Sequence, residues 1–111
     1  MAKKIAKIII DGVIEKENDN YKQEWVLDTI ETLEEKKDVV GIIVYINSPG
    51  GAVFESDEVY EALLRYKEKT KKPVYAYFAS LAASGGYYIG CAADKIIANR
   101  NTLTGSIGVI A

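Results

Sequence analysis

The apolar residues of this chain form four short runs, separated by stretches in which apolar residues recur every three or four positions. Short runs rich in β-branched residues are typical of strands, which we expect at 5–10, 39–46, 74–78 and 95–98. The second run reads Val-Val-Gly-Ile-Ile-Val-Tyr-Ile and is nearly continuous. Such a run predicts a strand that is covered on both faces of a sheet.

Two amphipathic helices are expected between these strands, because apolar side chains recur there at helical spacing among charged residues. A third, shorter helix is expected from about Ser84 towards Cys91. Alternation of strand and helix predicts an α/β fold, with a mostly parallel sheet, flanking helices and right-handed crossovers. The positions that define the first two helices are Val26, Ile30 and Leu33, then Val59, Ala62, Leu63 and Tyr66.

Composition narrows the functional classes. The chain has 111 residues, enough for one domain, and a formal net charge of -2 with no basic stripe, so we expect no nucleic-acid partner. Histidine is absent, which excludes a Ser-His-Asp triad or an imidazole metal site built by this chain alone. We therefore expect no metal and no cofactor. The single cysteine, Cys91, has small neighbours and is expected to be a buried structural thiol.

A glycine-rich break, Asn47-Ser48-Pro49-Gly50-Gly51, follows the second predicted strand. Consecutive glycines allow backbone angles closed to other residues and let a ligand approach the main chain. The segment is either a tight strand-to-helix turn or a turn that directs a backbone N–H at a developing oxyanion. Both interpretations stay open for this segment alone, although strand ends are where open α/β folds build their sites.

A second break follows the third predicted strand and contains Ser84-Gly85-Gly86-Tyr87-Tyr88. A serine at the start of a helix is exposed and lies near unpaired amides, as a nucleophile requires. The alternative is a serine N-cap whose glycines pack against a neighbouring helix. Ser80 is a competing nucleophile, but no glycine pair beside it leaves room for a substrate.

These two breaks, followed by Ala92-Ala93-Asp94-Lys95-Ile96 and Leu103-Thr104-Gly105-Ser106-Ile107-Gly108, resemble the signal peptide peptidase A family in order and spacing. The fold of that family resembles those of Clp protease and crotonase. The resemblance implies that Ser84 is the nucleophile. It implies that the amides of Gly51, or alternatively Gly50, and of Gly85 bind the oxyanion, and that Ser106 orients a catalytic lysine.

The same resemblance implies a serine endopeptidase with a Ser/Lys dyad, degrading cleaved signal peptides or unfolded peptide segments. The family's general-base lysine lies beyond the residues of this chain. We therefore expect residues 1–111 to be the truncated N-terminal part of one catalytic domain, an incomplete fold that is inactive and soluble alone. The parent protein is expected to be a homo-oligomer, anchored in a membrane by a segment absent here, with its catalytic domain on the extracytoplasmic side.

Three other functions remain open from the sequence. A Ser/Lys protease of the same group could act on a membrane-scaffold partner. A crotonase-like hydratase would use paired amides for the enolate of an acyl-CoA thioester, but it has no use for a serine nucleophile. A non-catalytic assembly module would use the two glycine-rich breaks only for packing.

Overall fold

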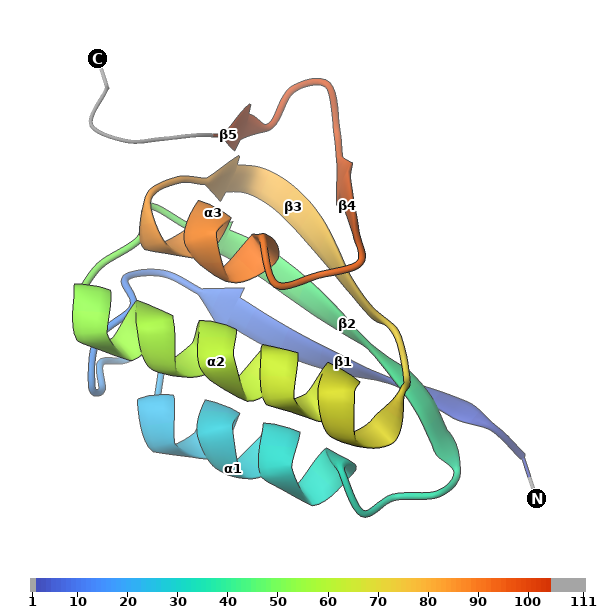
Figure 1. Ribbon diagram of the computed structural model, residues 1–111. Coiled ribbons are helices and arrows are strands. Elements are labelled where there is room, and N and C mark those ends of the chain that lie inside the picture. Colours follow the sequence, from blue (N-terminus) through green and yellow to red (C-terminus); the bar gives the residue numbers. More distant parts are fainter. Residues whose placement is uncertain (1, 105–111) are drawn as a thin grey trace.

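The computed structural model describes residues 2–104 (Figure 1). All four predicted strands and all three predicted helices are present, which confirms the α/β fold. The second and third strands run further than predicted, into the segments that we expected to be turns. The elements are β1 (Lys4–Asp11), α1 (Gln23–Leu33), β2 (Val39–Ser48), α2 (Val53–Thr70), β3 (Val74–Ala82), α3 (Gly85–Gly90), β4 (Lys95–Ala98) and β5 (Leu103–Thr104).

The sheet is parallel, and its strands lie in the order β1-β2-β3-β4, with β5 also pairing with β3. Each strand is therefore added on the same side of the one before it. Crossovers of one hand then place every connecting helix on the same face of the sheet. Figure 1 shows α1, α2 and α3 together on that face.

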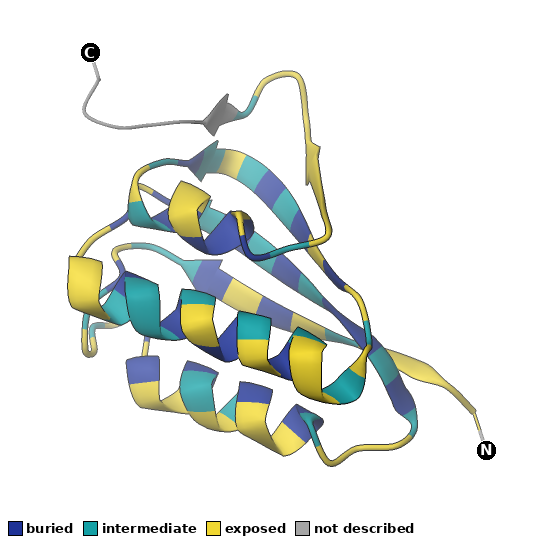
Figure 2. Ribbon diagram, in the orientation of Figure 1, coloured by how far each residue is buried: buried dark blue, intermediate teal, exposed yellow. Residues whose placement is uncertain are grey.

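The core lies between these helices and the sheet. Apolar side chains from alternate strand positions meet the inward faces of α1 and α2, and Figure 2 shows these inward positions in dark blue. Burying these side chains is the main source of the fold's stability. The most deeply buried of them include Ile8, Ile10, Val26, Ile30, Ile42, Val44, Ile46, Val59, Leu63, Tyr66, Phe78 and Ile89.

The opposite face of the sheet carries no helix within residues 2–104 (Figure 1). Ile9 on β1 and Ile97 on β4 are about half exposed there, at 50% and 51%. Burial along β2 alternates between buried and half-buried, instead of being complete at every position. The prediction of a strand covered on both faces is therefore wrong for the described part of the chain, because all the crossovers lie on one side.

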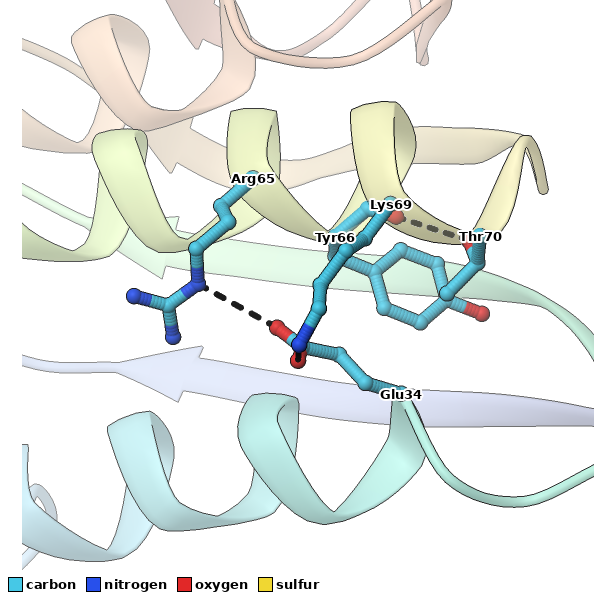
Figure 3. A network of polar contacts seen from close by, with 5 residues as sticks. All are labelled: Glu34, Arg65, Tyr66, Lys69 and Thr70. Atoms are coloured by element: carbon cyan, nitrogen blue, oxygen red, sulfur yellow. Dashed lines mark hydrogen bonds and ion pairs between the residues drawn. The ribbon is translucent and has the colours of Figure 1, made fainter.

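An ion-pair network joins the end of α1 to α2 (Figure 3). The Glu34 carboxylate, with a side chain only 4% exposed, accepts hydrogen bonds from Arg65 Nε at 3.3 Å and Lys69 Nζ at 3.2 Å. Beside it, the Thr70 hydroxyl donates to the main-chain carbonyl of Tyr66 at 2.7 Å. The Tyr66 hydroxyl is buried and has no hydrogen-bond partner among the described residues.

Candidate active site

The carboxyl ends of β2 and β3 are joined by hydrogen bonds that Asn47 and Ser48 accept. The Asn47 side-chain oxygen accepts the Leu81 N–H at 3.3 Å, and the Ser48 carbonyl oxygen accepts the Ala83 N–H at 3.1 Å. The strand register shifts between Ile46 and Ser48, which lets β3 take up extra residues there. These contacts fix the position of the segment that leads into Ser84.

The turn at Gly50 and Gly51 is held by hydrogen bonds on two sides. Fully buried Ser48 accepts the Gly50 N–H on its side-chain oxygen at 2.9 Å. Ile14 donates its N–H to the Gly50 carbonyl at 2.9 Å and accepts the Ala52 N–H at 2.7 Å. The Gly51 N–H donates to no residue within 2–104. Of the two glycine amides, that of Gly51 is therefore the one available to a ligand.

Ser84 lies on a strained turn between β3 and α3. Its φ of 48° and ψ of -118° are angles that a residue with a side chain rarely adopts. The residue is exposed, and its side chain makes no capping hydrogen bond to α3. The N-cap interpretation is therefore not the one that the structure favours. A strained strand-to-helix turn that exposes a hydroxyl is typical of nucleophilic serines in α/β folds.

The structure brings the two glycine-rich breaks together. A Cβ placed on Gly50, which has φ 101°, would lie 2.7 Å from both Gly85 N and Ser84 Cβ. The Gly50 Cα lies 3.5 Å from where a Cβ of Gly85 would be, and that Cβ would also collide with the Ser56 hydroxyl. The Gly85 N–H, like that of Gly51, donates to no described residue. One exposed hydroxyl and two uncommitted amides therefore lie side by side.

A groove of about 970 Å³ opens beside these groups. Its walls include the exposed apolar side chains of Val53 and Phe54, from the first turn of α2. No lysine, arginine or histidine of the described residues lines it. The groove can therefore receive an apolar chain, but it offers Ser84 neither a lysine nor a histidine as a base. Its lining residues are Gly51, Val53, Phe54, Ser56, Asp57, Ser84, Gly85, Tyr87, Tyr88 and Cys91.

Asp57 and Tyr88 form a polar contact in this groove that the sequence analysis missed. The Tyr88 hydroxyl donates to Asp57 Oδ1 at 2.6 Å, and the ring of Tyr60 stacks on that of Tyr88 at 4.4 Å between centroids. The hydrogen bond to Asp57 raises the pKa of Tyr88 to about 12. Asp57 and Tyr60 are three residues apart on α2, a spacing that predicts one helix face but not the partner that they meet.

The other sequence predictions have different outcomes. Ser80 is exposed and lines a separate pocket with Tyr45 and Tyr77, so it does not share the groove of Ser84. Ser106 lies outside the described residues. The prediction of a buried Cys91 is wrong: its side chain is exposed in the groove, because its neighbours Gly90 and Ala92 take the inward positions of this turn.

Within residues 2–104, no group of three or more His, Cys, Asp or Glu side chains is placed to hold a metal ion. None of the helices in the same range has both the length and the apolar character that crossing a bilayer requires.

Comparison with known proteins places the chain in a family. Residues 66–111 match Peptidase family S49. A provisionally named signal peptide peptidase SppA of Enterococcus faecium is 40% identical over 97% of this chain, which spans 33% of that relative's length. Among solved structures, a mutant of the membrane-bound stomatin-specific protease 1510-N superposes with a TM-score of 0.68, at 23% identity, over 95% of this chain and 48% of that one. A mutant ClpP1 from Listeria monocytogenes gives 0.64 at 25% identity, over 88% and 50%.

The parallel sheet, with a strained serine beside a glycine turn at its edge, therefore belongs to the Clp-like class of serine peptidase folds. Within that class, the chain belongs to Peptidase family S49. The resemblance to signal peptide peptidase A stated from the sequence is confirmed. The roles of the individual site residues are not tested by these comparisons and stay predictions.

Proposed function

We propose that this chain supplies the nucleophile and the oxyanion-binding amides of a serine endopeptidase that works with a Ser/Lys dyad. The observation that carries the proposal is the contact between Gly50 and the Ser84–Gly85 backbone at the shared end of β2 and β3. One reacting carbonyl must reach a nucleophile and two donors at once, and this edge offers all three groups. The family assignment supports the same chemistry.

In this mechanism, Ser84 Oγ attacks the carbonyl carbon of the scissile peptide bond, and its proton passes to a general base. The carbonyl oxygen becomes an oxyanion, which accepts hydrogen bonds from the N–H groups of Gly51 and Gly85. Collapse of this intermediate breaks the C–N bond, and the leaving amine takes the proton back from the base. Water then hydrolyses the acyl ester at Ser84 by the same steps.

The general base in this proposal is a lysine outside residues 2–104, and Ser106 orients it. A lysine acts as a base at neutral pH only when burial or nearby cations lower its pKa. The groove lining holds no lysine among the described residues, so the base must approach Ser84 from another part of the protein. The hydroxyl alone is too weak a nucleophile for turnover.

The substrates in this proposal are cleaved signal peptides and other unfolded segments. The exposed apolar walls of the groove suit an extended apolar peptide, whose burial there would favour binding. We propose also that the full-length protein is a homo-oligomer and acts at a membrane. The uncovered apolar side chains of the sheet support the first point, and the name of the Enterococcus faecium relative supports the second.

The test is covalent labelling of the full-length protein by a fluorophosphonate, followed by peptide mapping. We expect one adduct on Ser84, none in Ser84→Ala, and undiminished labelling in Ser80→Ala. Ser80 is a matched control, because it is an exposed serine near the end of the same strand but in a different pocket. Labelling that persists in Ser84→Ala, or a wild-type protein that does not react, would overturn the proposal.

A further inference from the structure

Tyr88 contacts both halves of the candidate active site. Its main-chain N–H donates to the Ser84 carbonyl oxygen at 2.9 Å. This hydrogen bond forms the first turn of α3 and connects it to the main chain of Ser84. Its side-chain hydroxyl donates to Asp57 Oδ1 at 2.6 Å. Asp57 lies one turn into α2, the helix that begins directly after the glycine turn. One residue therefore connects the serine segment to the element that follows the oxyanion turn.

The Tyr88 side chain is held on a second side. The Tyr60 ring stacks on it with a centroid separation of 4.4 Å and an interplanar angle of 23°. Tyr60 is half-buried on α2, one turn after Asp57. A ring stacked on one neighbour and hydrogen-bonded to another has a fixed orientation, so its main chain is restrained as well.

The helix that carries Tyr88 needs such a restraint. α3 has only six residues, Gly-Gly-Tyr-Tyr-Ile-Gly, and half of them are glycine. A helix this short is unstable by itself, and glycine lowers its stability further. Inward-facing Ile89 fixes one side of it in the core, and Tyr87 and Tyr88 are the only residues of α3 that bring a side chain larger than a hydrogen atom to the groove.

We propose that Tyr88 is a positioning residue, held in place by Asp57 and Tyr60. It keeps Ser84 and the Gly85 amide at a fixed position relative to the Gly51 amide. The proposal extends the peptidase function above and rests on it for its kinetic consequence. Tyr88 acts through the main chain of Ser84 and not on the reacting atoms.

The experiment compares four substitutions in the full-length protein: Tyr88→Phe, Asp57→Ala, Asp57→Asn and Tyr75→Phe. The first two remove the hydrogen bond from either end. Asp57→Asn keeps an acceptor oxygen without the charge. Tyr75→Phe is the matched control, because it removes a phenol hydroxyl from the face of the sheet away from the helices.

Two quantities are measured for each variant. The first is amide hydrogen exchange at Tyr88, whose N–H bonds to Ser84, with Ile30 of α1 as an internal reference. The second is the hydrolysis of an unstructured peptide, resolved into kcat and KM. We expect Tyr88→Phe and Asp57→Ala to speed exchange at Tyr88 and lower kcat, each about tenfold, as for loss of one hydrogen bond to a charged group. KM should stay within about twofold, because the substrate contacts remain.

Asp57→Asn should fall between these variants and the wild type, and Tyr75→Phe should match the wild type. Unchanged exchange at Tyr88 in both Tyr88→Phe and Asp57→Ala would overturn the inference. A rise in KM with kcat unchanged would also overturn it, since Tyr88 would then be a substrate contact. If the wild-type protein has no peptidase activity, the proposed function fails, and the exchange rates alone decide whether Tyr88 restrains Ser84.

Discussion

The main-chain N–H of Ala83 donates a 3.1 Å hydrogen bond to the carbonyl oxygen of Ser48. Ala83 directly precedes the candidate nucleophile, and Ser48 lies two residues before the glycine turn. The bond continues the parallel pairing of β2 and β3 to the point where both chains leave the sheet. Segments more than thirty residues apart in the sequence therefore enter the site from one rigid edge.

Substitution of Gly50 by alanine is expected to destabilise the protein by about 1–3 kcal/mol, because the new side chain meets a positive φ and two close neighbours. The Cβ would lie 2.7 Å from Gly85 N and from Ser84 Cβ. The measurement is urea unfolding. Pro49→Ala, in the exposed part of the same turn, is the control and should have a smaller effect. Equal effects of the two substitutions would contradict the close contact at Gly50.

Tyr66→Phe should leave the free energy of unfolding unchanged or raise it by up to about 1 kcal/mol, because the buried hydroxyl that it removes has no partner among the described residues. Tyr21→Phe is the matched control. The Tyr21 hydroxyl donates to Gln23 Oε1 at 2.5 Å, and both side chains are buried. Its removal should lower stability by about 1 kcal/mol, since a buried acceptor is left unpaired. The reverse order in thermal unfolding would refute both assignments.

The stability of the protein should fall at high pH through ionisation of Tyr88. The pKa of this phenol is raised from 10.0 to about 12 by its hydrogen bond to Asp57. The folded state therefore favours the protonated form. Its contribution is fully present below the unfolded pKa and is lost as pH rises through the folded pKa.

Urea unfolding between pH 10.0 and about 12 should therefore show a steeper loss of stability in the wild type than in Tyr88→Phe. Burial raises the pKa of Tyr21 as well, so some loss should remain in that variant. Parallel curves for the two proteins would show that Tyr88 titrates alike in the folded and unfolded states.

Modification of Cys91 by a bulky thiol reagent should slow the reaction of Ser84 with a fluorophosphonate. The two side chains are exposed and line the same groove, so a group attached to the cysteine occupies the space that the reagent must enter. The measurement is the labelling rate before and after thiol modification. Cys91→Ser should remove the effect of the thiol reagent, and a rate unaffected in the wild type would place Cys91 away from the path to Ser84.

A polypeptide of these 111 residues alone should not hydrolyse peptides. Histidine is absent, and no lysine of the described residues lines the groove, so the groove offers Ser84 neither of these two bases. Hydrolysis of an unstructured peptide by this polypeptide and by the full-length protein is the comparison to make. Turnover by the 111-residue polypeptide that disappears in Ser84→Ala would reveal a base within it.

Short apolar runs were sufficient to predict the strands, and apolar residues recurring every three or four positions were sufficient to predict α1 and α2. The glycine pairs revealed the edge of the site, since their backbone angles and close approach are properties of glycine itself. The contact between Asp57 and Tyr88 could not be predicted, because it joins two elements whose separation depends on packing. The open face of the sheet likewise depends on which side the crossovers lie, and the exposure of Cys91 depends on which residues of its turn face inwards.

The backbone angle at Ser84 decides which replacements of this residue relieve strain. Glycine adopts a φ of 48° without strain, whereas serine and alanine are both strained at this angle. Replacement of this serine by glycine would therefore relieve the backbone strain, whereas replacement by alanine would not. Family members whose site has lost this serine should therefore have glycine at the position more often than alanine.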